Sequence, residues 1–154
     1  MHAIGEVDEA NSAIGVALTL VEDERYGRQL RATQNEMFDL GADIATPGGI
    51  DGALRITAGQ VERLEQEIDV LNADLEPLTS FILPGGSPAA ASLHCARCIV
   101  RRAERAAVAL NEAEPVNAQA LAYLNRLSDH LFVLARHVAL SSGGDVLWQP
   151  GATR

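Results

Sequence analysis

The sequence predicts an all-α protein, a single-domain bundle of five helices, and three observations support this fold class. Apolar residues make up 47% of the 154 residues, but aromatic residues make up only 4%. Alanine and leucine dominate the apolar set, which favours close helix packing over a β-sandwich rich in Val, Tyr and Trp. Apolar residues also recur at helical spacing in five segments that Gly, Pro and Ser separate. We expect these helices to pack up and down, as in ferritin-like bundles.

The first two helices are predicted at about residues 5–21 and 25–45. In each, apolar side chains repeat every three or four positions, which is the pattern of a helix with one buried face. The first stripe holds Val7, Ala10, Ile14, Ala17 or Leu18, and Val21, and the second holds Leu30, Met37, Leu40 and Ile44. The second helix should end at the turn-forming stretch TPGGIDG.

The third helix is predicted to begin after Thr57, because Thr57 and Gln60 have the spacing of a capping box, and to fade near Leu75. The turn LPGGSP follows it. Ser87 then suits the N-cap of a fourth helix and Pro88 its first position. The fourth helix should run to about residue 111 and be about 37 Å long.

The fifth helix is predicted at about residues 117–141. Its buried face should carry Leu124, Leu127, Leu131 and Leu134. The stretch SSGGD should end it.

Charge and hydropathy exclude several classes of protein. The formal net charge is −9 and the pI is about 4.8, so the overall field repels polyanions and argues against nucleic-acid binding. No stretch approaches 18 uninterrupted apolar residues, and the N-terminus lacks the pattern of a secretory signal. We therefore expect a cytoplasmic protein with no membrane partner.

The two cysteines, Cys95 and Cys98, have CxxC spacing. They fall in the middle of a predicted helix, whereas thiols are activated at helix N-termini, and no second Cys/His pair completes a zinc site. We expect buried, reduced thiols.

Basic residues concentrate in one run of nine residues, RCIVRRAER, which holds four of the twelve arginines. By helical spacing, His94, Arg97, Arg101 and Glu104 should share one face of the fourth helix, whereas Arg102 turns away. One interpretation is a solvated surface on which Arg and Glu pair three positions apart. The other is a binding site.

Polar side chains on two other helices favour the binding site. Asn125 and Asp129 lie four positions apart on the fifth helix, and Asp8 lies near the start of the first. If these faces converge on the arginines, they line one site for an anion, because the planar arginine fork grips phosphate oxygens bidentately. The cluster suits an anion of polyphosphate size.

Four stretches of the sequence form a specific combination of motifs. They are GEVDEANSAIG (5–15), FILPGGSPAAASLHCARCIVRRAER (81–105), YLNRLSDHLFVLAR (123–136) and GDVLW (144–148). In them the chain resembles the PduO-type ATP:cob(I)alamin adenosyltransferases, a family of trimeric five-helix bundles. The resemblance implies an enzyme that transfers the 5′-deoxyadenosyl group of ATP to cob(I)alamin and releases triphosphate.

The resemblance also implies roles for particular residues. It places Arg97, Arg101, Glu104 and Asn125 on ATP, with Mg²⁺ bound to the nucleotide near Glu104 and not directly by the protein. Arg97, Arg101 and Asp8 would be catalytic, Asp8 by pairing with Arg97. Corrin contacts would come from Phe81, which crowds the lower face of the ring, and from Asp129; without the resemblance, Phe81 reads as a core residue.

The resemblance further implies a homotrimer and a possible handover of the product to an adenosylcobalamin-dependent mutase. One departure stands out: the family's N-terminal glycine-rich ATP loop and its lysine have no counterpart in a chain that begins MHAIGEVDE and contains no lysine. Either a leader precedes these residues, which we favour, or this is a shortened member with weak ATP binding.

Three other functions are alternatives. A bundle that binds corrinoid or nucleotide without catalysis fits the missing loop. A ferritin-like metal bundle lacks its ligands, because the residues three positions before His94, His130 and His137 are Ala91, Leu127 and Leu134, not Glu. Nucleic-acid binding is the weakest, given the charge and the few aromatic residues.

Overall fold

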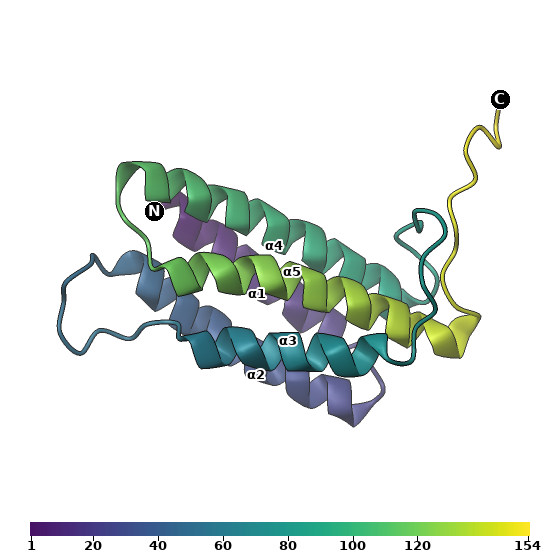
Figure 1. The fold of residues 1–154 in the computed structure, drawn as a ribbon, viewed down its shortest axis with the longest axis horizontal. Coiled ribbons are helices and arrows are strands. Elements are labelled where there is room, and N and C mark those ends of the chain that lie inside the picture. The colour runs from purple at the N-terminus through teal and green to yellow at the C-terminus, as the bar shows by residue number, and fades with distance from the viewer.

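The computed structural model of residues 1–154 shows five α-helices and one turn of 3-10 helix (Figure 1). The elements are α1 (His2–Leu18), α2 (Glu24–Ala45), α3 (Ala58–Asn72), α4 (Pro88–Ala113), α5 (Ala118–Ala139) and η1 (Leu140–Ser142). The predicted five-helix, all-α fold is confirmed, and the predicted bounds agree to within three residues at every helix end. None of the helices is both long and apolar enough to cross a membrane.

The helices lie roughly along one axis (Figure 1), and α4 packs against both α1 and α5. On the outer sides of this trio, α2 packs against α1 and α3 packs against α5. Connections between successive helices are short except for residues 46–57 and 73–87. The long helices α4 and α5 pack against each other and carry five of the predicted site residues, Arg97, Arg101, Glu104, Asn125 and Asp129.

The predicted apolar stripes form one core. Leu124, Leu127, Leu131 and Leu134 of α5 are fully buried, as are Ile14 of α1 and Leu30 and Leu40 of α2. Each such side chain stabilises the fold by about 1.5–3 kcal/mol. On α4 the buried face is made mainly of small residues, Ala96, Val100, Ala103 and Ala107, so α1 and α5 can approach α4 closely.

Side-chain caps fix the helix starts where the sequence indicated them. Ser87 Oγ accepts a hydrogen bond of 3.1 Å from the backbone N–H of Ala90, and Pro88 opens α4. Gln60 Oε1 accepts a bond of 2.9 Å from the backbone N–H of Thr57 at the start of α3. These bonds satisfy donors that a helix N-terminus leaves free.

A buried carboxylate anchors the connection between α2 and α3. Asp43 accepts hydrogen bonds from Arg55 Nη1 at 2.7 Å, from the backbone N–H of Ile56 at 2.8 Å and from Asn117 Nδ2 at 2.7 Å. Because Asn117 also caps α5, one side chain ties the end of α2 to the start of α5.

The C-terminal segment leaves the bundle after η1 and runs beside the connection between α3 and α4 (Figure 1). Two backbone hydrogen bonds join them, from Leu83 N–H to Val146 O at 2.7 Å and from Trp148 N–H to Phe81 O at 2.8 Å. We call residues 80–83 together with 146–148 the ribbon. It projects from one end of the bundle.

Candidate functional site

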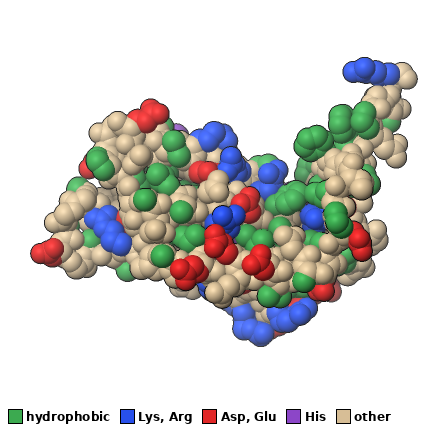
Figure 2. Space-filling model, in the orientation of Figure 1, with side chains coloured by type: hydrophobic (Ala, Val, Ile, Leu, Met, Phe, Trp, Pro, Cys, Tyr) green, Lys and Arg blue, Asp and Glu red, His purple; other side chains and the backbone are tan.

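Three of the predicted ATP-binding residues form one network across α4 and α5. Glu104 lies at its centre. Arg101 Nη1 donates to Glu104 Oε2 at 2.5 Å, and Asn125 Nδ2 donates to Glu104 Oε1 at 2.9 Å. Figure 2 shows basic side chains over the middle of α4 next to acidic ones. The structure thus brings together Glu104 of α4 and Asn125 of α5, from two of the three helices whose polar faces were expected to converge.

Arg97 lies one turn before Arg101 on α4 and differs from it in its contacts. Its guanidinium carbon is 5.9 Å from the centre of the Phe132 ring on α5, close enough for a cation–π interaction. Its Nη2 lies 3.5 Å from Cys98 Sγ, and its Nε is buried without a hydrogen-bond partner. No carboxylate of the chain pairs with Arg97, so the charge of its guanidinium is not neutralised by an ion pair.

His94 lies one turn closer to the start of α4 and is buried. Its ring meets Phe132 edge to face, with ring centres 6.0 Å apart. Burial lowers the pKa of His94, and the charge of Arg97 lowers it further, while Asp145 opposes both. The imidazole is therefore neutral at pH 7, and the positive charge of this region belongs to the arginines.

The two predicted aspartates lie apart from this network. Asp8 is exposed on α1 and forms no ion pair within the chain; its neighbours Glu6 and Glu9 instead bind Arg102, which turns toward α1. Asp129 is exposed on α5 and lies 3.1 Å from Arg126. The expected pairing of Asp8 with Arg97 does not occur within one chain.

Phe81 is 78% exposed, so its interpretation as a core residue is wrong. Its ring lies in the ribbon, edge to face with Trp148 at 6.0 Å between ring centres. Figure 2 shows hydrophobic side chains gathered over this projecting part of the molecule. The sequence interpretation gave Trp148 no role. It could have been singled out because it is a large aromatic residue in the motif GDVLW, close to the glycines that turn the chain.

The prediction of buried cysteines is also wrong. Cys95 and Cys98 are free but exposed, because the buried stripe of α4 runs through Leu93, Ala96 and Val100 and leaves positions 95 and 98 outside. The helical spacing that put the arginines on the outer face of α4 also predicts exposed thiols at these two positions.

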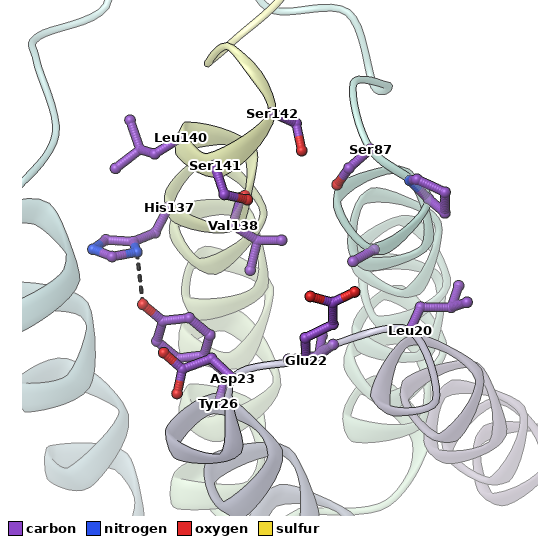
Figure 3. Close-up of a pocket in the computed structure, with 13 residues that line it drawn as sticks. Leu20, Glu22, Asp23, Tyr26, Ser87, His137, Val138, Leu140, Ser141 and Ser142 are labelled. Atoms are coloured by element: carbon purple, nitrogen blue, oxygen red, sulfur yellow. Dashed lines mark hydrogen bonds between the residues drawn. The ribbon is translucent and has the colours of Figure 1, made fainter.

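A cavity of about 940 Å³ opens at the end of the bundle that carries the ribbon. It lies between the α1–α2 connection, the start of α4 and the end of α5 (Figure 3). Burial raises the pKa of Tyr26, so its hydroxyl keeps its proton, and the hydroxyl oxygen and Nδ1 of His137 share a hydrogen bond of 2.8 Å. Nε2 of His137 donates to Asp74, 3.1 Å away. None of the predicted site residues lines this cavity.

The side chains of this chain form no metal centre: no group of three or more His, Cys, Asp or Glu side chains is placed to hold an ion. Glu104 is the carboxylate of the predicted ATP site, and both its oxygens already accept hydrogen bonds.

Comparisons with known proteins agree on one family. The family model described as cobalamin adenosyltransferase matches residues 1–138. A corrinoid adenosyltransferase of Mycobacterium tuberculosis is 49% identical, covering 99% of this chain and 81% of that protein. One of Bacillus subtilis is 42% identical with the same coverage.

Solved structures give the same result. A variant PduO-type ATP:corrinoid adenosyltransferase from Lactobacillus reuteri, complexed with cobalamin and ATP, superposes with a TM-score of 0.90 at 35% identity. That match covers 96% of this chain and 82% of the other. Another variant, complexed with ATP, superposes with a TM-score of 0.89 at 36% identity, covering 96% and 86%.

Proposed function

This chain belongs to the cobalamin adenosyltransferase family, and from that premise we propose that its α4–α5 surface transfers the 5′-deoxyadenosyl group of ATP to cob(I)alamin. In this reaction the cobalt attacks C5′ of the ribose. The C5′–O bond breaks, and its electron pair leaves with the triphosphate. The observation that carries the proposal is the Arg101–Glu104–Asn125 network with the unpaired Arg97 one turn away.

The two arginines serve the leaving group. Negative charge accumulates on the triphosphate as the bond breaks, and cations already aimed at it stabilise the transition state more than the ground state. Glu104 holds Arg101 in one orientation and so reduces the reorganisation needed during the reaction. Arg97 has no carboxylate partner, so its positive charge can act on the phosphates. Its guanidinium lies over the Phe132 ring at cation–π distance.

Mg²⁺ fits this site as a companion of the nucleotide. Magnesium retains several waters and is usually held by substrate phosphates with one or two carboxylates, and Glu104 would be the nearest carboxylate once one of its hydrogen bonds is released. The ion would neutralise part of the phosphate charge.

Corrin binding is proposed for Phe81, with Asp129 as a second contact. The exposed ring of Phe81 is available to pack against the lower face of a corrin and exclude an axial ligand from the cobalt. Without that ligand cobalt is easier to reduce. Its exposure and its place in an apolar ribbon support this role.

The wider setting of the reaction is also proposed. We expect residues 1–154 to act as one domain within a homotrimer in the cytoplasm, with product handover to an adenosylcobalamin-dependent mutase. The resemblance of the motifs supports the trimer and the handover.

The test is an anaerobic assay with chemically reduced cobalamin and MgATP, in which the corrin absorption reports formation of the cobalt–carbon bond. Arg101→Ala should lower kcat/KM by about 10²–10³-fold, the usual cost of removing one preorganised donor. Arg28→Ala, an exposed arginine on α2 without a salt bridge, is the matched control. Equal activity of the two variants would contradict the leaving-group role of Arg101.

A further inference from the structure

The position of Phe81 is not fixed by packing. The side chain is 78% exposed, and the Trp148 ring beside it is itself 45% exposed. A ring with so few neighbours is free to change rotamer. A ring that crowds one face of a ligand must nevertheless occupy one place, so other contacts have to hold the backbone of Phe81.

The ribbon supplies part of this support. Trp148 N–H donates to Phe81 O at 2.8 Å, Leu83 N–H donates to Val146 O at 2.7 Å, and Ser80 Oγ donates to Trp148 O at 3.1 Å. However, an isolated pair of strands is marginally stable at best in water. The ribbon lies outside the core (Figure 1), so it needs an anchor in the bundle.

Arg136, in the last turn of α5, is that anchor. It is 8% exposed. Its Nε donates to Asp145 Oδ2 at 2.8 Å, and its Nη2 donates to the backbone carbonyl of Glu76 at 2.8 Å. One guanidinium thus binds both segments that form the ribbon, because Asp145 directly precedes Val146 and Glu76 lies five residues before Phe81.

The chain is shaped for this contact. Gly143 and Gly144 have φ angles of 97° and 85°, a left-handed backbone conformation that residues other than glycine rarely adopt. The turn they form brings Asp145 back to Arg136, nine positions earlier. Burying a guanidinium is costly unless a carboxylate and further acceptors satisfy it, and here Asp145 and the Glu76 carbonyl do so.

We propose that Arg136 is a positioning residue for the corrin site, which holds Phe81 in place through the ribbon without touching the substrate. The inference rests on the function proposed above for Phe81. The core face of α5, with Leu127, Leu131 and Leu134, does not depend on Arg136. Loss of Arg136 should therefore release the ribbon and leave the bundle folded.

The chain provides its own reporter, because Trp148 is its only tryptophan. In substrate-free protein, Arg136→Ala should raise the Stern–Volmer constant for acrylamide quenching at least twofold. In the assay, it should raise KM for cob(I)alamin at least tenfold while KM for ATP stays within twofold. Asp145→Asn, which keeps the shape and the guanidinium, should change both measurements in the same direction by less.

Arg31→Ala is the control, since it removes an arginine paired with Glu24 on the surface of α2. It should leave both measurements unchanged. If Arg136→Ala does not fold, the quenching and the KM of Asp145→Asn alone test the positioning role. Unchanged quenching, or a KM for cob(I)alamin that does not rise when quenching does, would overturn the positioning role. An inactive wild type whose quenching still responds to Arg136→Ala would instead contradict the proposed function and leave the anchor established.

Discussion

At the scale of single residues, the arginines of the proposed site differ in their partners: Arg101 is paired with a carboxylate and Arg97 is not. Glu104 accepts hydrogen bonds from Arg101 and from Asn125, whereas no carboxylate bonds to Arg97. A solvated surface of Arg–Glu pairs explains the first contact but not the second, because Asn125 joins the network from another helix. An arginine without a carboxylate partner is what the proposed anion site requires.

Phe81 gives a residue-scale prediction about stability. Because its side chain is exposed, Phe81→Ala should change the free energy of unfolding by no more than about 0.5 kcal/mol. Leu127→Ala, which removes a fully buried side chain, should cost about 2–5 kcal/mol. Urea unfolding followed by circular dichroism measures both. A cost for Phe81→Ala close to that of Leu127→Ala would show that the ring packs in the core after all.

At the scale of elements, a buried ionic network joins α2, α3 and α5. Arg63 of α3 binds Glu36 of α2 at 2.5 Å and Glu67 of its own helix at 2.6 Å. Tyr123 of α5 donates to Glu36 at 2.7 Å, and His130 Nε2 lies 2.8 Å from Glu67. The last pair has an ion-pair distance but not the geometry of a hydrogen bond. The network fixes how α3 sits on its two neighbours.

This network predicts how stability depends on pH. Burial alone would raise the pKa of Glu67, but His130 and Arg63 outweigh burial and hold the pKa below its ordinary value of 4.5. The carboxylate therefore stabilises the folded state fully above pH 4.5, and this contribution is lost as the pH falls through the lowered pKa.

Urea unfolding between pH 7 and pH 3 checks the prediction. Wild-type stability should fall more steeply below pH 4.5 than that of Glu67→Gln, which cannot ionise at this position. Glu65→Gln, on the exposed side of α3, serves as the control and should follow the wild type. Parallel curves for wild type and Glu67→Gln would show that Glu67 does not stabilise the fold through its charge.

At the scale of the whole molecule, the bundle presents apolar side chains that its own core does not use. Val16 of α1, Phe38 of α2 and Val70 of α3 are each more than half exposed, and Asp8 lies unpaired on α1. Light scattering of purified protein should give three times the chain mass of 16.4 kDa if the proposed trimer forms. A mass of one chain at micromolar concentration would contradict it.

The sequence by itself determined the five helices, their caps and their buried faces, because periodicity and capping depend on residues within one or two turns. It also placed Arg97, Arg101 and Glu104 on one face for the same reason. The missed exposure of Cys95 and Cys98 was within its reach, since the phase of α4 is local information.

Tertiary structure alone decided which faces meet. The bond from Asn125 to Glu104, the anchoring of two distant segments by Arg136 and the pairing of Phe81 with Trp148 join residues 9 to 67 positions apart. Such contacts depend on the rotation and register of packed helices and on the turn at Gly143 and Gly144. Side-chain packing across the whole core fixes these quantities, and no short stretch of sequence contains them.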